Sequence, residues 1–415
     1  MKNFKDSGIE WLGEIPQHWE VSKFKYFYRS NMGETILAQD LKDEGVPIYS
    51  ATEDDKFFGR IKNPINLLNI NDFVIPARGN SIGAVKIVKE KSTCTQTTIF
   101  SKQFKEMNPY YVYYFLSGYR KFLFEFTQTA IPQITISQVN DNPILYPPLK
   151  EQEQIANFLD EKCEQIANFI EKKEKLISLL KEQKQVLINE TITKGLDKNA
   201  NFKDSSIKHL GEIPKHWEVK RLATFGRFSK GGNISRQDLV ESGDSALLYG
   251  DIYMNYEIST SCLDSKISKN TSLGAIPIYK GDILFAGSGE TKEDIGKNIV
   301  YLGKDKAFAG GDVIIFRQKE NNALYLSYAL NSKYAKFCKG IESKGEIIVH
   351  IYASNLKDIR IPLPPLKEQE QIVNFLDEKC EKIDLLIEKT KKQIKLIKEY
   401  KTTLINQAVC GRIDL

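Results

Sequence analysis

The chain contains two copies of one sequence framework, and this duplication limits what it can fold into more than any other feature. Residues 4–21 read FKDSGIEWLGEIPQHWEV, and residues 202–219 repeat them with four differences. Residues 147–167 read PPLKEQEQIANFLDEKCEQIA, and residues 364–384 repeat them with three differences. Because internal repeats mark repeated structural units, we expect each half to contain a leader, an insert, PPLKEQEQI and a long charged segment.

The two inserts, residues 22–146 and 220–363, share almost no identity but keep the same order of features. Each begins with short apolar runs that are typical of strands. Each continues with an aromatic segment of helical character, at residues 110–126 and 325–338, and returns through a strand to PPL. The inserts are therefore predicted to be two mixed α/β domains of one fold with different surfaces.

A long helix is predicted after each Pro-Pro pair, because neither Pro nor Gly occurs again before Gly195 and Gly411. Heptads counted from Leu159 and Leu376 place mostly apolar side chains at the a and d positions, as in a coiled coil. The first helix ends where the second half begins, so antiparallel pairing is the economical arrangement. The alternative is that each helix packs on a separate partner.

The predicted fold class is α+β, with two mixed α/β domains separated by two long antiparallel coiled-coil helices in a pseudo-two-fold internal duplication. Lys184 and Lys401 occupy equivalent seam positions, where polar residues often fix the register. The predicted segments are a first domain with its leader, a first helix, a second domain with the repeated leader, and a second helix with the C-terminal tail. Their boundaries are 1–148, 149–195, 196–365 and 366–415.

Charge and cysteine content narrow the functional classes. The 59 basic and 54 acidic residues give a net charge of +5, so nucleic-acid binding requires local patches rather than a polycationic chain. Six scattered cysteines without a CxxC pair argue against a disulfide scaffold and a zinc site. The chain begins without a secretory leader and lacks an 18-residue apolar run, so a cytoplasmic protein is expected.

No complete catalytic constellation is visible in the sequence. FAGSG at residues 285–289 resembles a loop that binds S-adenosylmethionine, but it would need a preceding strand, a following helix and a catalytic motif. The (N/D)PP(Y/F) element of amino-methyltransferases, the phosphate-binding GxxxxGK(S/T) loop and HExxH are all missing. His18 and His216 recur in the leaders beside Trp19 and Trp217, where a packed structural corner is expected.

The residues of the inserts indicate DNA binding rather than catalysis. Arg and Lys donate to guanine, Asn and Gln pair with adenine, Ser and Thr adapt to either, and Lys and backbone amides position phosphates. Such residues gather beside glycines, which let backbones approach closely. In the first insert they are Arg78, Asn80, Ser81, Lys86, Thr95, Gln96, Thr97, Gln133 and Thr135. In the second insert they are Lys230, Asn233, Arg236, Ser288, Glu290, Thr291, Lys292 and Lys297.

These features together resemble the specificity subunit of type I restriction-modification systems. The duplicated framework, the GEIPxHWE leaders, the two PPLKEQEQI helix starts and GDILFAGSGETKEDIGK at residues 281–297 carry the resemblance, which covers essentially the whole chain. It implies that each insert is a target recognition domain reading one half of a bipartite, asymmetric double-stranded DNA sequence. The coiled coil would then set the spacer between the two halves.

The resemblance also implies partners and a division of chemistry. Two methyltransferase subunits would dock on the helices and carry S-adenosylmethionine, and restriction subunits that use ATP and Mg would be further partners. This chain would bind no cofactor or metal and would not be an enzyme. Candidate docking residues on the helices are Glu151, Glu153, Lys162, Glu368, Glu370 and Lys379. The alternatives are a free-standing nucleic-acid methyltransferase and a coiled-coil adaptor that does not touch DNA.

Overall fold

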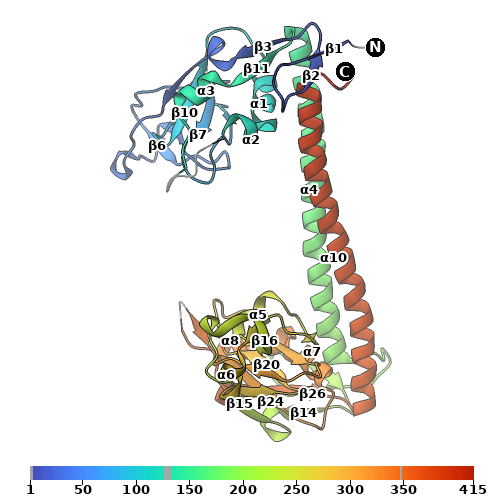
Figure 1. Ribbon diagram of the computed structural model, residues 1–415. Coiled ribbons are helices and arrows are strands. Elements are labelled where there is room, and N and C mark those ends of the chain that lie inside the picture. Colours follow the sequence, from blue (N-terminus) through green and yellow to red (C-terminus); the bar gives the residue numbers. More distant parts are fainter. Residues whose placement is uncertain (1–2, 126–131, 346–347) are drawn as a thin grey trace. The chain divides into compact units, whose positions relative to one another are not determined.

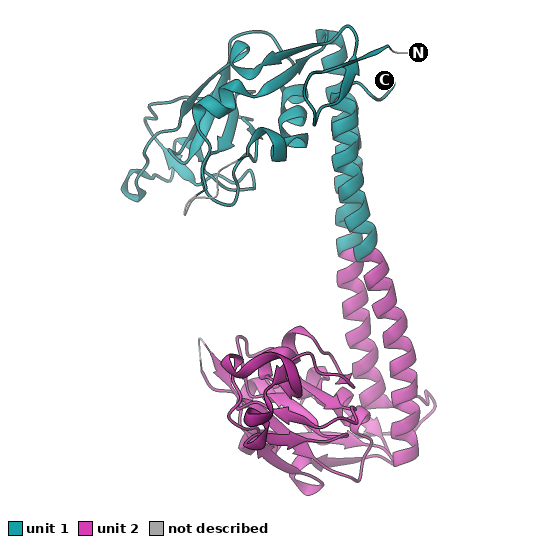
Figure 2. Ribbon diagram, in the orientation of Figure 1, with its two compact units in different colours: residues 1–174, 391–415 teal, residues 175–390 magenta. Residues whose placement is uncertain are grey.

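The fold is taken from a computed structural model, which describes residues 3–125, 132–345 and 348–415 (Figure 1). The chain divides into two compact units, residues 1–174 with 391–415 (unit 1) and residues 175–390 (unit 2), coloured separately in Figure 2. Each unit combines an α/β part with one segment of each of two long helices. Both helices occur where the sequence predicts them, and the α+β class is confirmed.

In unit 1, the central sheet of the described residues has four strands in the order β4-β10-β7-β8, and a smaller sheet has the order β6-β5-β9. The strands of unit 1 are β1 (Phe4–Asp6), β2 (Glu14–Pro16), β3 (Glu20–Lys23), β4 (Tyr28–Met32), β5 (Val46–Tyr49), β6 (Gly59–Ile61), β7 (Phe73–Pro76), β8 (Lys86–Ile87), β9 (Thr93–Cys94), β10 (Thr98–Gln103) and β11 (Pro143–Tyr146). Its short helices are η1 (Phe24–Tyr26), η2 (Ala38–Asp40), α1 (Pro109–Gly118), α2 (Arg120–Leu123) and α3 (Ile136–Asp141).

In unit 2, the corresponding sheet has the order β15-β24-β20-β22-β17, and a second sheet has the order β18-β16-β23-β19. The strands of unit 2 are β12 (Phe202–Asp204), β13 (Glu212–Pro214), β14 (Glu218–Arg221), β15 (Arg227–Lys230), β16 (Leu239–Leu247), β17 (Ser259–Thr260), β18 (Lys266–Ile267), β19 (Ile276–Ile278), β20 (Ile283–Ala286), β21 (Ser288–Gly289), β22 (Asn298–Tyr301), β23 (Ala307–Ala309), β24 (Val313–Arg317), β25 (Val349–His350) and β26 (Arg360–Leu363). Its short helices are η3 (Leu222–Thr224), η4 (Arg236–Asp238), α5 (Tyr249–Met254), α6 (Lys269–Leu273), α7 (Ala323–Leu330), α8 (Lys333–Glu342) and α9 (Ala353–Leu356).

The repeated leaders fold in the same way in the two units. Each leader forms a two-stranded hairpin, β1-β2 in unit 1 and β12-β13 in unit 2. The next leader strand pairs antiparallel with the strand that enters the long helix, β3 with β11 and β14 with β26. Trp19 and Trp217 are buried in the cores behind these strands, which confirms the packed corner predicted for the leaders.

The long helices are α4 (Leu149–Lys194) and α10 (Leu366–Val409). A segment of α4 packs beside a segment of α10 within each unit, and both segments contribute to each unit's apolar core. Every a and d position of the predicted heptads, from Leu159 to Thr191 and from Leu376 to Ala408, is buried or half-buried. The heptad pattern therefore marks the inward side of each helix.

The aromatic segments have the predicted helical character, and each is divided into two helices. In unit 1, α1 and α2 are separated at Tyr119, and residue 126 of the predicted segment lies outside the described residues. In unit 2, α7 ends and α8 begins around Asn331 and Ser332. The Ser332 side chain accepts a hydrogen bond from Ala335 N at 3.3 Å, so it caps a new helix instead of continuing the old one.

Candidate nucleic-acid interface

In unit 1, three segments that are far apart in the insert meet at one place. Ala77 N donates to Thr97 O at 2.9 Å, and Ile134 N donates to Ala77 O at 3.0 Å. The next residue, Arg78, forms an antiparallel bridge with Gln133. The structure thus brings together three of the predicted clusters, at residues 78–81, 95–97 and 133–135.

The side chains of these clusters combine exposure with local order. Those of Arg78, Asn80, Gln96, Gln133 and Thr135 are exposed, and those of Ser81, Thr95 and Thr97 are half-buried. The Thr95 and Thr97 hydroxyls lie 2.8 Å apart, and Gln96 Oε1 accepts from Thr35 Oγ1 at 2.9 Å. Thr135 caps α3 by accepting from Gln138 N at 3.2 Å. The cluster presents donors and acceptors that can hydrogen-bond to base edges.

Lys86 does not belong to this set, and its prediction as a DNA contact is wrong. It lies on β8 with 2% of its surface exposed. Its Nζ donates to Ser50 O at 3.0 Å and to Thr52 Oγ1 at 2.8 Å. Burial lowers the pKa of the Lys86 amine below its usual value. This amine ties the loop after β5 to the central sheet.

In unit 2, three of the predicted residues, Arg236, Glu290 and Thr291, line two adjoining hollows. Lys230, Asn233, Arg236, Glu290, Thr291 and Lys292 all have exposed side chains. Arg236 lines both a hollow of about 270 Å³ and a neighbouring one of about 440 Å³. Glu290 and Thr291 line the larger one, together with Tyr249. Charged and hydroxyl groups thus surround a concave surface.

Ser288 and Lys297 both make structural contacts in unit 2. Ser288 is buried, so its prediction as a DNA contact is wrong, whereas Lys297 is half-buried and its DNA contact stays a prediction. Ser288 is 3% exposed, and its Oγ lies 2.9 Å from His350 Nδ1 and 3.2 Å from Asp312 Oδ2. Lys297 Nζ donates to Tyr256 O at 2.6 Å, and burial lowers the pKa of this amine. Both side chains fasten the ends of the loop that carries residues 290–292.

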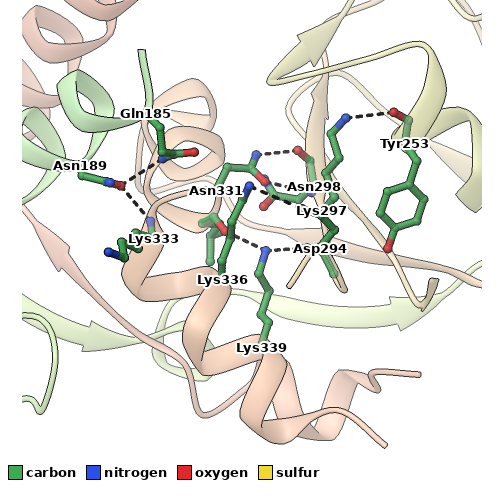
Figure 3. Close-up of polar contacts among 12 residues, drawn as sticks. Gln185, Asn189, Tyr253, Asp294, Lys297, Asn298, Asn331, Lys333, Lys336 and Lys339 are labelled. Carbon is green, nitrogen blue, oxygen red and sulfur yellow. Dashed lines mark hydrogen bonds and ion pairs between the residues drawn. The ribbon is translucent and has the colours of Figure 1, made fainter. Parts of the chain in front are cut away.

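A buried polar network below this loop was not predicted (Figure 3). Lys339 on α8 is fully buried, and its Nζ donates to Gly296 O at 2.6 Å and to Leu330 O at 2.8 Å. Burial lowers the pKa of Lys339 to about 7. Asn331 Nδ2 donates to Asn298 O at 2.7 Å. The burial of Lys339 could have been predicted from the helical spacing, because Lys339 lies on the same side of α8 as the buried Tyr334 and Ala335.

A second signal that was missed repeats in both aromatic helices. Asn108, Tyr111 and Tyr114 have the same spacing as Asn322, Tyr325 and Tyr328. Each Asn caps its helix, and its backbone N–H donates to the side chain of Gln152 or Gln369 at 2.8 or 2.9 Å. The hydroxyls of Tyr114 and Tyr328 donate to Asp160 and Asp377, both at 2.7 Å. Each insert is thereby fixed to the start of its long helix.

The candidate docking residues lie on the first four turns of α4 and α10. Glu151 and Glu368 are half-buried, and each contacts the His and Trp of a leader. Glu153 and Glu370 are exposed. Lys162 and Lys379 are half-buried, and their amines lie over the rings of Phe158 and Phe375, 5.9 and 5.7 Å from the centroids. The docking role of all six remains a prediction.

The segment at residues 285–289, which resembles a loop that binds S-adenosylmethionine, is not followed by the helix that such a loop needs. Residues 285–289 run from β20 into β21, and the next regular element of unit 2 is the strand β22. Since no helix follows the glycines, the helix N-terminus that would bind an anion is missing at this place.

Over the described residues, no group of three or more His, Cys, Asp or Glu side chains is placed to hold a metal ion. None of the helices described there has the length and apolar character of a membrane span.

Comparison with known proteins identifies the family. The sequence model of the type I restriction modification DNA specificity domain matches twice, at residues 16–187 and 214–396. The specificity subunit of the type I restriction enzyme MjaVIII from Methanocaldococcus jannaschii is 27% identical over 433 residues, covering 99% of this chain and 96% of that protein.

Solved structures show the same fold. A structure that describes complex assembly and conformational transition of a type I restriction-modification system has a chain with a TM-score of 0.72. It is 14% identical, and the match covers 96% of this chain and 99% of that one. The HsdS subunit from Thermoanaerobacter tengcongensis has a TM-score of 0.52 at 15% identity, over 96% and 98% of the two chains.

The two family matches cover most of both units, including the converging clusters of unit 1 and the hollows of unit 2. The chain therefore belongs to the family of type I restriction-modification DNA specificity domains, and a role in DNA recognition follows from that membership.

Proposed function

We propose that the chain selects the DNA target of a type I restriction-modification complex, with each insert reading one half of a bipartite, asymmetric sequence. The observation that carries this proposal is the double family match, one in each half of the sequence, around inserts that differ in sequence. Two identical readers related by a two-fold axis would read a palindrome. Divergent inserts on a repeated framework suit two unlike half-sites.

In this proposal, residues 1–148 and 196–365 are target recognition domains, and residues 149–195 and 366–415 form an antiparallel, pseudo-two-fold coiled coil. The coiled coil sets the spacer between the half-sites and docks two methyltransferase subunits. Its support is that every predicted a and d position is buried or half-buried, and that segments of α4 and α10 are in contact within each unit. Because a heptad repeat keeps one face turned to its partner, helix length can be changed by whole heptads.

The chemistry is assigned to partner subunits. S-adenosylmethionine would be bound by the methyltransferase subunits, and ATP and Mg by restriction subunits. This chain would contribute recognition and scaffolding, without catalysis. This assignment is supported by residues 285–289, which are followed by the strand β22, whereas a loop that binds S-adenosylmethionine would be followed by a helix.

Methylome sequencing of cells that produce the chain with its methyltransferase partner tests the proposal. The expected result is one bipartite motif with two unlike halves. Replacing residues 22–146 by the insert of another specificity subunit should change one half and leave the other. Adding one heptad to α4 and one to α10 should lengthen the spacer only. A change in both halves after the insert exchange would contradict separate reading.

The two alternatives give different results. Methyl transfer by the purified chain without partners would indicate a free-standing enzyme. Failure of the assembled complex to protect DNA in a footprint would indicate an adaptor that does not touch DNA. Each outcome contradicts a different part of the proposal.

A further inference from the structure

A third hollow adjoins the two that contain Arg236 on unit 2. It measures about 760 Å³, and it shares Asp294 with the hollow of about 440 Å³. That hollow in turn shares Arg236, Tyr249 and Gly250 with the smallest one. The three hollows therefore adjoin one another through these shared residues, and the loop at residues 289–294 lines two of them.

The third hollow has a basic lining that differs from that of the other two. Lys333 and Lys336 come from the first turn of α8, and Lys292 comes from the loop opposite. Two carboxylates, Glu293 and Asp294, also line it, so lysines outnumber acids. Because Lys and backbone amides mainly contact phosphates, this lining suits a polyanion rather than a base edge.

The three lysines are held to different degrees. Lys336 Nζ lies 3.8 Å from Asp294 Oδ1, a long ion pair. Within the part of the chain that the structure describes, no hydrogen bond or ion pair occupies the amines of Lys292 and Lys333. Both side chains are exposed. Two of the three ammonium groups are thus available to an incoming anion.

The backbone that carries the lysines is firmly fixed. Lys333 N donates to Asn189 Oδ1 of α4 at 2.8 Å, and Asn189 Oδ1 also accepts from Gln185 Nε2 at 3.1 Å (Figure 3). On the other side of α8, the buried Lys339 amine donates a hydrogen bond to Gly296 O, just after the loop at residues 289–294. An anion that binds Lys333 and Lys336 is therefore held at a fixed position relative to both α4 and the loop at residues 289–294.

The two hollows that contain Arg236 have a different chemistry. The Arg236 guanidinium has no hydrogen bond or ion pair to another described residue, whereas its backbone is held in η4 by Asp238 Oδ2, which accepts from Ser235 N at 2.8 Å. Tyr249, Met254 and Ile348 stand around it with 40, 72 and 57% of their surfaces exposed. A free guanidinium beside apolar side chains suits a guanine edge next to a thymine methyl group.

We propose that Lys292, Lys333 and Lys336 form a phosphate-contact site that positions the DNA backbone, while Arg236 on the same face reads a base of the half-site. This inference rests on the proposed function, and it adds a ligand class, the backbone phosphates, to α8. The hollow also has an apolar wall, Phe337 and Ile341, which would suit a protein partner. The adjoining Arg236 region and the excess of lysines favour DNA.

The test uses the complex of this chain with its methyltransferase partner. Its binding is measured at several salt concentrations to two DNA duplexes, one that contains the motif found by methylome sequencing and one that lacks this motif. In Lys333→Gln/Lys336→Gln, affinity for both duplexes should fall by the same factor. The slope of log K against log salt should become shallower by about 2, since each phosphate contact contributes about 0.9. In Arg236→Ala, affinity for the motif should fall ~10–100-fold, with little change for the other duplex.

The matched control is Lys304→Gln/Lys319→Gln, which removes two exposed lysines of unit 2 that line none of the three hollows. It should keep the wild-type slope and affinity. If the α8 variant keeps the wild-type slope, or loses assembly with the partner subunit instead of DNA affinity, the phosphate site is contradicted. If the wild-type complex does not prefer the motif, the proposed function itself fails, and this outcome is separate from the first two.

Discussion

The Glu151 carboxylate accepts a hydrogen bond from Trp19 Nε1 at 2.9 Å, and its other oxygen lies 2.7 Å from His18 Nε2. Glu368 makes the same two contacts to the second leader, and its bond from Trp217 measures 3.1 Å. Both Trp side chains are almost completely buried, so each indole N–H depends on this acceptor. The Glu of PPLKEQ and the HW of the leader therefore form one structural unit in each half.

Glu151→Ala is expected to destabilise unit 1, because it leaves the buried Trp19 N–H without an acceptor. The cost should be about 1–3 kcal/mol, the usual penalty for an unsatisfied buried donor. A lower thermal unfolding midpoint, by several degrees, would show it. Glu153→Ala removes an exposed carboxylate two residues later and is the control. Equal midpoints for the two variants would mean that the contact does not hold the leader.

Lys184 and Lys401 are equivalent seam positions whose removal should have unequal effects. Lys184 Nζ lies 2.7 Å from Asp384 on α10 and 2.5 Å from Glu257, with 12% of its side chain exposed. Lys184→Met should cost about 1–2 kcal/mol, less than the 3–5 of a fully buried pair, because Asp384 is half exposed. Lys401→Met should cost less, since its amine has no ion pair to a described residue.

Thermal unfolding at low and high salt checks this pair of variants. The difference between wild type and Lys184→Met should shrink as salt rises, because the exposed side of the ion pair is screened. The Lys401→Met difference should not depend on salt. Equal losses in both variants would show that Lys184 acts through its methylenes and not through its charge.

The long helices could be predicted in detail because their signals are local. The Pro-Pro pairs precede α4 and α10, and Gly195 and Gly411 follow them with φ of +72° and +69°. Left-handed backbone of this kind favours glycine at a helix end. The heptad period also identifies the buried side without any knowledge of the partner surface. Local chain chemistry thus decides where each helix begins, ends and packs.

The binding residues could be predicted only in part, because burial depends on contacts far apart in the chain. Lys86 and Lys292 are both lysines near glycines, yet the Lys86 amine is enclosed by Ser50 and Thr52 whereas the Lys292 side chain is exposed. Residue type does not contain that difference. The convergence at Arg78 likewise depends on the pairing of β7 with β10, which the sequence does not specify.

Lys339 should make stability depend on pH. Its pKa is about 7 in the folded chain and near 10.5 when exposed, so between these values the unfolded chain holds a proton that the folded chain has released. Stability should therefore rise with pH from about 7 to 10.5 and be independent of this group below 7. The difference in unfolding free energy between wild type and Lys339→Met should grow by about 1 kcal/mol per pH unit.

Chemical unfolding at pH 7.5, 8.5 and 9.5 measures that difference. Lys333→Met, on the exposed side of the same helix, is the control and should show no such trend. A constant difference between wild type and Lys339→Met over this range would mean that the buried amine stays charged at every pH.

Arg78 and Lys86 should separate DNA binding from folding in unit 1. Arg78→Ala removes an exposed guanidinium beside Gln133 and should weaken binding to the methylated motif by ~5–100-fold, with the unfolding midpoint unchanged. Lys86→Met leaves Ser50 O and Thr52 Oγ1 without their donor and should cost about 1–3 kcal/mol of stability. Below its unfolding midpoint, its affinity for DNA should equal that of wild type, because the amine does not reach the surface. Binding titrations with the assembled complex and thermal unfolding of both variants give the comparison. A Lys86→Met complex that stays folded but loses DNA affinity would place this amine at the interface and overturn its structural role.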